Sequence, residues 1–120
     1  LLGTLSTRLQ AEAARAATRH GLRHSWIPDE LIAPVELDPR IRSAIQRQAD
    51  SLGLSNLAMP SGAGHDSQNM ATIVPTGMIF VPSKAGRSHC PEEDTDWNDV
   101  ANGANVLLNT LIELATNDIS

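Results

Sequence analysis

Two histidines that follow short glycine-containing loops are the residues of this sequence best suited to chemistry. The loop that begins at Ser61 leads to His65 and Asp66, and the loop that begins at Ser83 leads to His89. Glycine tolerates positive backbone φ angles and lets the chain pass close to a ligand, so each loop could aim an imidazole into a site. Both histidines are therefore candidate site residues.

His89 opens the segment His-Cys-Pro-Glu-Glu, and neutral imidazole is the commonest protein ligand for zinc. A catalytic zinc needs about three protein ligands and an open position for water. No partner stands at a typical zinc spacing, so further ligands have to come from outside the chain or from His65, Glu92 or Glu93. One of the two glutamates could instead fix the tautomer of His89. The alternative is that His89 is a loop histidine bonded to these carboxylates.

Cys90 beside His89 suggests a nucleophile and its base. Neighbouring residues on an extended backbone point to opposite sides, however, which works against a bond between them. A cysteine-dependent hydrolase therefore ranks last; it predicts that Cys90→Ser abolishes turnover while chelators have no effect.

Composition narrows the classes of partner. The net charge of −5 and the absence of a Lys/Arg cluster argue against nucleic acid or an anionic membrane surface. No apolar run approaches the roughly 18 residues of a membrane span. The single cysteine is compatible with a reducing compartment, so the cytoplasm is the expected location. Because the sequence starts at Leu1 within a helical pattern, we expect a fragment of a longer protein.

Apolar residues at spacings of three and four predict three longer helices. The first should end near Gly21, the second should run from the N-cap Asp38 to Gly53, and the last should begin after Thr95 as its N-cap. The expected buried side of the last helix consists of Val100, Ala104, Leu107, Leu108, Leu111 and Leu114.

The middle of the chain predicts an α/β arrangement. Short strands are expected near residues 56–59 and 77–81, with a helix over about 66–73 between them. Strand, loop, helix and strand form the pattern of a parallel βαβ unit. Both loops would then leave the same carboxyl edge of a sheet, where His65 and His89 could face one crevice.

Four segments carry a resemblance to a known family: MPSGAGHDSQNMA, PTGMIFVPS, GRSHCPEE and NDVANGANVLL. They resemble the carboxyl-terminal part of the zinc-dependent amidases that include N-carbamoyl-L-amino-acid amidohydrolase, allantoate amidohydrolase and β-ureidopropionase. These enzymes belong to the superfamily of aminoacylases and metal exopeptidases. The match is dense over residues 38–114, and SGAGHD followed by SH-x-PEE is specific to this branch.

The resemblance implies a two-domain enzyme whose metal-binding α/β domain is interrupted by a smaller lid. Residues 1–36 would be the end of the lid, which also forms a homodimer. Residues 37–120 would be the carboxyl-terminal part of a metallo-exopeptidase-like α/β domain, with a βαβ unit and flanking helices.

The same resemblance implies the site. His89 would be a ligand of one of two metal ions, zinc or else manganese or cobalt, with Glu92 or Glu93 orienting it. The residues expected to border the substrate pocket are His65, Gly64, Gly86 and Ser88. The other ligands, the general-base glutamate and an arginine that grips the substrate carboxylate would precede Leu1, so no catalytic residue is assigned within this chain.

The implied reaction is metal-assisted hydrolysis of a C–N bond in an N-carbamoyl amino acid or an allantoate-type ureido acid. Two departures from the family pattern, Arg87 and Cys90, leave the substrate open, since Arg87 could bind an anionic group or turn outward. The chain alone is expected to be inactive. The alternative is a non-catalytic remnant that binds a small acid or a protein partner.

Overall fold

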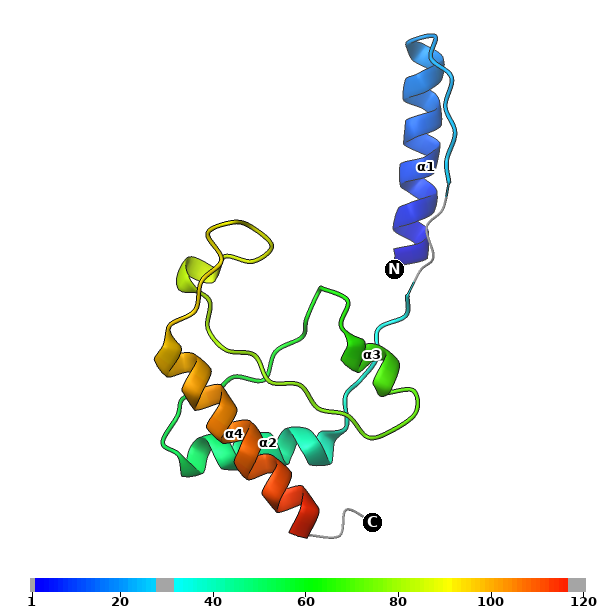
Figure 1. The fold of residues 1–120 in the computed structure, drawn as a ribbon. Helices are drawn as coiled ribbons and strands as arrows, with labels where there is room; N and C mark the ends of the chain where they lie inside the picture. The colour runs from blue at the N-terminus through cyan, green and yellow to red at the C-terminus, as the bar shows by residue number, and fades with distance from the viewer. Residues whose placement is uncertain (1, 28–31, 117–120) are drawn as a thin grey trace. The chain divides into compact units, whose positions relative to one another are not determined.

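The computed structural model describes residues 2–27 and 32–116 (Figure 1). The chain divides into two compact units, Leu1–Ala33 and Pro34–Ser120. The assignment of residues 1–36 to a lid and of residues 37–120 to a metal-binding domain stays a prediction.

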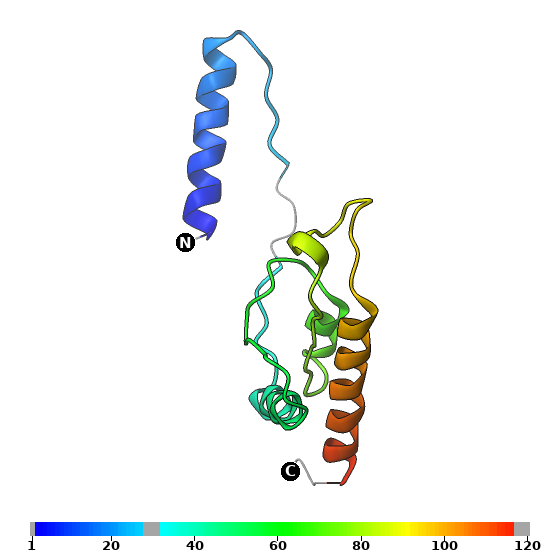
Figure 2. The same cartoon turned by 90° about the vertical axis from the view of Figure 1, so that its left-hand side faces the viewer.

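The first unit contains helix α1, Leu2–Arg19, which confirms the first predicted helix. Gly21 ends it with a φ of 64°, and the amide of Leu22 donates to the carbonyl of Ala17 at 2.9 Å. This is the glycine-dependent closure expected at a helix C-terminus. After α1 the chain reverses and runs in the opposite direction to the helix (Figure 2).

Helix α2, Pro39–Ser51, confirms the second predicted helix and both of its ends. The carboxylate of Asp38 accepts hydrogen bonds from the amides of Arg40 at 2.8 Å and Ile41 at 3.4 Å, so it caps amides that have no partner within the helix. The side chain of Arg40 also bonds this carboxylate and lowers the pKa of Asp38. At the other end, Gly53 has a φ of 68°.

The two remaining α-helices depart from expectation at one end each. Helix α3, Asp66–Met70, is shorter than the predicted span and continues into turns. Helix α4, Trp97–Thr116, confirms the last predicted helix but begins one residue later. Asp96 therefore precedes it in place of Thr95, and the carbonyl of Asp96 accepts from the amides of Asp99 and Val100.

Helices α2 and α4 pack against each other and form the core of the second unit (Figure 1). Ala44 and Ala49 of α2 are buried with Val106 of α4. Thr110 is buried as well, and its hydroxyl donates to the carbonyl of Val106 at 2.7 Å. Because the buried side chains are small, the two helix backbones can lie close together.

Polar side chains also join the two helices. Arg47 of α2 forms an ion pair with Glu113 of α4. Gln48 donates from Nε2 to Oε2 of the same glutamate at 2.5 Å. The bond from Arg47, and after it the bond from Gln48, lowers the pKa of Glu113.

The extended segment of residues 77–81 contacts both helices at glycines. A Cβ on Gly77 would lie 2.4 Å from Cγ2 of Ile41 in α2, and a Cβ on Gly103 of α4 would lie 2.4 Å from Cγ1 of Val81. Either distance is far shorter than a normal carbon contact. The two glycines therefore allow this segment to lie directly against α2 and α4.

The predicted βαβ unit is absent from the described residues. Residues 56–59 and 77–81 are free of helix, as predicted, but neither is a strand. Within residues 2–27 and 32–116, no backbone hydrogen bond joins these two segments. A strand needs a ladder to a neighbour, and each segment lacks one here. What the structure supports is a helical arrangement with two extended connections.

The prediction for the buried side of α4 was also wrong. Leu107, Leu108 and Leu111 are each at least half exposed, whereas Val106 and Thr110 make the contact with α2. The helix carries apolar residues around more than one face, and its packing in this chain uses the face with the smaller side chains. No described helix is long and apolar enough to cross a membrane.

Candidate functional site

The first histidine loop is braced by its own serine. Ser61 Oγ lies 2.7 Å from Nε2 of His65, and it also accepts a hydrogen bond from the amide of Ala63 at 3.2 Å. His65 itself has extended backbone angles immediately before α3. The hydroxyl of Ser61 thus holds both the turn of the loop and the ring of His65.

A second contact holds the His65 ring from the extended segment of residues 77–81. The ring of Phe80 meets it edge to face, with centroids 5.4 Å apart and planes at 64°. Such an arrangement is favourable for aromatic pairs. His65 is half-buried between these contacts.

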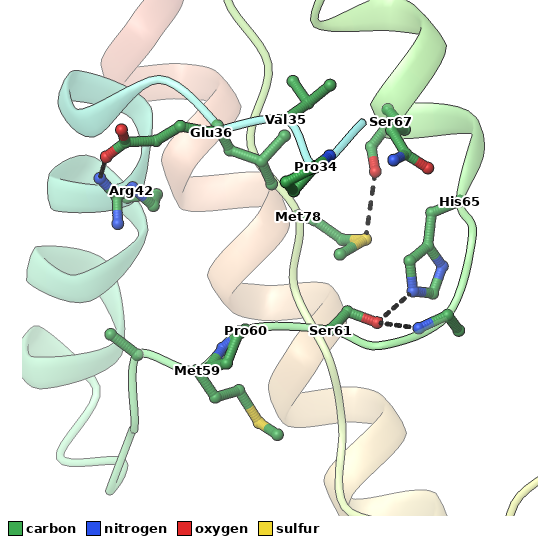
Figure 3. Close-up of a pocket in the computed structure, with 14 residues that line it drawn as sticks. Pro34, Val35, Glu36, Arg42, Met59, Pro60, Ser61, His65, Ser67 and Met78 are labelled. Carbon is green, nitrogen blue, oxygen red and sulfur yellow. Dashed lines mark hydrogen bonds and ion pairs between the residues drawn. The ribbon is translucent and has the colours of Figure 1, made fainter. Parts of the chain in front are cut away.

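His65 lines a cavity of about 420 Å³ in the second unit (Figure 3). The picture shows Ser61 and His65 turned toward each other and Met78 turned toward Ser67, whose hydroxyl is 3.3 Å from the Met78 sulfur. Most of the lining is apolar or uncharged, and it consists of Pro34, Val35, Glu36, Leu37, Arg42, Ala58, Met59, Pro60, Ser61, Ala63, His65, Ser67, Gln68 and Met78.

Two opposite charges stand at this cavity. Arg42 of α2 pairs with Glu36 at 3.1 Å, and both side chains are well exposed. Because both side chains are exposed, the pair contributes little to stability.

The predicted pocket residues are not all brought together. Of the four, His65 lines the cavity, and Gly64, Gly86 and Ser88 lie outside its lining. A Cβ on Gly64 would only just touch Gln68, and one on Gly86 would meet nothing. That these residues border a substrate pocket stays a prediction.

The second histidine loop has an unusual backbone. A short 3₁₀ turn, η1, covers Lys84–Gly86, and Gly86 has a φ of 65°. Ala85 and His89 also have positive φ, at 56° and 58°. Positive φ is uncommon outside glycine and is costly unless surrounding contacts hold it. The loop must therefore be fixed by specific bonds.

Lys84 provides one such bond. Its Nζ lies 2.6 Å from Asp94 and 2.9 Å from Asp96, and its amide donates to the carbonyl of Asp94 at 2.8 Å. These contacts join the two ends of the loop that carries His89. The carboxylates raise the pKa of Lys84, and Lys84 in turn lowers the pKa of Asp94.

His89 contacts one of the two glutamates through its backbone and a serine through its ring. Ser88 Oγ, rather than a glutamate, contacts the ring, at 2.8 Å from Nδ1. Glu93 does bond His89, but its Oε2 accepts from the backbone amide at 2.7 Å. Glu92 lies 3.6 Å from the guanidinium of Arg87. The two glutamates hold the loop, and a hydroxyl holds the imidazole.

The His89 side chain suits a metal ligand. It is exposed, and Nδ1 is engaged by Ser88, while Nε2 has no hydrogen-bond partner among the described residues. Metal-binding histidines commonly have one ring nitrogen held by a protein group and the other on the ion. Within residues 2–27 and 32–116, no three His, Cys, Asp or Glu side chains gather closely enough to hold a metal.

Cys90 gives no support to a cysteine nucleophile. The thiol is half-buried, and it makes no hydrogen bond to an imidazole in the described part of the chain. The carbonyl of Cys90 instead accepts from the amide of Glu93, which tightens the turn that follows His89.

Sequence reasoning missed the roles of Phe80 and Lys84. Phe80 lies in a segment predicted as a strand. Because successive side chains of a strand face opposite sides, this prediction would have placed Phe80 on one side of a sheet. The contacts of Lys84 could have been predicted from charge. An acidic run that contains Asp94 and Asp96 follows the same loop.

Comparisons with known proteins point in one direction. The profile of the family described as peptidase family M20/M25/M40 matches residues 11–113. N-carbamoyl-L-amino-acid amidohydrolase of Paenarthrobacter aurescens is 44% identical over 110 residues, which are 92% of this chain and 27% of that protein. Allantoate amidohydrolase of Escherichia coli K12 is 39% identical over 90 residues, which are 75% of this chain and 21% of that protein.

A solved structure agrees with these similarities. The crystal structure of an amidase of the hydantoinase/carbamoylase family from Burkholderia vietnamiensis is 35% identical, with a TM-score of 0.87 over 93% of this chain and 27% of that one. The chain thus spans about a quarter of the length of the proteins that it matches.

Proposed function

Because this chain belongs to the peptidase family M20/M25/M40, we propose that the complete protein is a metal-dependent amidohydrolase. Its substrate would be an N-carbamoyl amino acid or an allantoate-type ureido acid, cleaved at a non-peptide C–N bond. The observation that carries the proposal is the 44% identity to an N-carbamoyl-L-amino-acid amidohydrolase across 92% of the chain. The geometry of the two histidine loops supports it.

His89 is the residue of this chain that would hold a metal ion, zinc or else manganese or cobalt, in a site of two ions. When bound, the metal would polarise the scissile carbonyl and activate water. The remaining ligands and the general base would come from other parts of the complete protein. Glu93, through the amide of His89, and Glu92, through Arg87, would keep the loop in its ligating conformation.

His65 would serve the substrate. Its ring lines the cavity of about 420 Å³, a volume suited to a small organic acid. Ser61 and Phe80 restrict the ring, so that it could direct a hydrogen bond to a substrate oxygen without first having to be ordered. The residues that would leave room for the substrate beside the two histidine loops, because they are small, are Gly64, Gly86 and Ser88.

The domain roles follow from the same proposal. Residues 1–36 would belong to a lid that forms a homodimer, and residues 37–120 to the metal-binding domain. Leu5 and Leu9 of α1 are more than half exposed, which is consistent with a helix that is covered in the complete protein. The cytoplasm would be the compartment, since the one cysteine, Cys90, is free.

The test is ammonia release by the complete protein supplied with zinc or manganese. Allantoate, N-carbamoyl-β-alanine and a set of N-carbamoyl-L-amino acids form the panel, and an N-acetyl amino acid, which cannot yield ammonia, is the control. We expect release from one class of ureido acid and its loss on treatment with a chelator. No release from any of them would favour the non-catalytic remnant.

A further inference from the structure

Among the described side chains, the hydroxyl of Ser88 is the one that forms a hydrogen bond with the ring of His89. Oγ of Ser88 and Nδ1 of His89 are 2.8 Å apart, although the residues are neighbours in sequence. A backbone φ of 58° at His89 accompanies this contact. The pair is therefore a local device built by the loop itself.

The sense of this bond depends on which ring nitrogen carries the proton. A serine hydroxyl can donate or accept, whereas neutral imidazole has one donor and one acceptor nitrogen. If Nε2 binds a cation, Nδ1 must carry the proton, and Ser88 Oγ then accepts from it. The hydroxyl can follow this requirement by rotating.

The carboxylates that usually perform this task are occupied elsewhere. Glu93 accepts from the amide of His89, and Glu92 faces Arg87. Within the described ranges, neither carboxylate bonds the ring. Glu93 therefore bonds the backbone amide of His89, and Ser88 bonds its ring.

We propose that Ser88 is a positioning residue that holds the His89 imidazole with Nε2 directed to the metal. This inference rests on the proposed function. The group that contacts the ring is a neutral hydroxyl, which accepts more weakly than a carboxylate. Loss of a group that orients a metal ligand typically weakens metal binding about 10- to 100-fold.

The experiment measures Zn²⁺ affinity of the complete protein by competition with a chromophoric chelator. Ser88→Ala removes the hydroxyl, Ser88→Thr retains it, and His89→Ala removes the ligand. Ser83→Ala is the matched control, because Ser83 donates to the carbonyl of Arg87 in the same loop at 2.5 Å and does not touch the ring. The absorption spectrum of bound Co²⁺ provides a second readout, of ligand geometry.

We expect Ser88→Ala to weaken Zn²⁺ binding about tenfold or more and to change the Co²⁺ spectrum. Ser88→Thr should behave like the native protein, and Ser83→Ala should lose much less affinity. The inference is overturned if Ser88→Ala binds normally while His89→Ala does not, or if Ser83→Ala is equally impaired. Normal binding by His89→Ala would instead overturn the proposed function.

Discussion

At the scale of single residues, the two histidines are held in different ways. His65 is fixed through Nε2 by Ser61 and through a T-shaped ring contact by Phe80. His89 is an exposed residue held through Nδ1 and its backbone amide, and Nε2 has no hydrogen-bond partner in the described part of the chain. The first arrangement suits a residue that contacts substrate, and the second suits one that binds a metal.

Because the arrangement of His65 suits contact with substrate and not with metal, mutating His65 should change turnover and leave metal binding intact. In the complete protein, His65→Ala should lower kcat/KM about 10- to 100-fold, as expected when one hydrogen bond to a charged substrate is lost. Bound metal should be unchanged. Steady-state kinetics and elemental analysis make the comparison, with His20→Ala near the end of α1 as the control. Loss of metal in His65→Ala would show that its role has been misassigned.

The sequence predicted the loops that present the histidines, but it did not predict their bonding partners. The glycine and serine residues around His65 and His89 indicated sharp turns. In the His89 loop, the backbone φ angles at Ala85 and His89 are both positive although neither residue is glycine. No local propensity predicts such angles.

At the scale of elements, the packing of residues 77–81 against α2 requires glycine at position 77. A Cβ there would lie 2.4 Å from Cγ2 and 3.3 Å from Cβ of Ile41, and Cδ1 of Ile45 is only 3.1 Å away. Gly77→Ala should destabilise the protein by about 1–3 kcal/mol, because branched side chains close to a helix backbone cannot move aside. Gly62→Ala, where nothing is within 4 Å, should have little effect. Urea denaturation measures both, and equal stability would contradict the packing described here.

The link between α2 and α4 predicts a dependence on pH. Glu113 has a lower pKa in the folded state because Arg47 and Gln48 bond its carboxylate. The bond therefore stabilises the fold above the ordinary pKa of about 4.5 and is lost as the pH falls through the folded value. Glu113→Gln should lower Tm near neutral pH and approach the native Tm in acid.

Thermal unfolding between about pH 3 and pH 7 provides this test. Glu12→Gln is a suitable control, since Glu12 pairs with its exposed neighbour Arg15 within α1. A Tm difference for Glu113→Gln that stays constant across this range would refute the role given to the carboxylate.

Helices could be predicted from the sequence far better than strands. The cap at Asp38 and the glycines at residues 21 and 53 are local signals, and the structure confirms the helix ends that they mark. Strand pairing requires partners distant in sequence. Residues 56–59 and 77–81 contain apolar runs, but a run alone does not specify its neighbour.

At the scale of the whole molecule, apolar surface exceeds buried core. Among the described residues, the buried apolar side chains are Ala44, Ala49 and Val106. By contrast, Trp97 is 83% exposed and Leu108 is 55% exposed. Exposed apolar side chains in this number are typical of a surface that another part of a protein or a partner covers.

The purified chain of 120 residues should therefore self-associate and release no ammonia from the ureido acids. Its described residues supply no complete metal site, and its exposed leucines favour contact between copies. Light scattering after gel filtration measures the first property, and an ammonia assay measures the second. A monomeric chain with measurable turnover would refute this expectation.

His89 is the residue that we propose binds a catalytic metal in a C–N hydrolase. The most direct measurement is bound metal per subunit, together with ammonia release, for His89→Ala of the complete protein beside His24→Ala, which changes an exposed histidine of the first unit. We predict that His89→Ala loses metal and nearly all turnover, whereas His24→Ala retains both. Full metal content and unchanged turnover in His89→Ala would contradict the account.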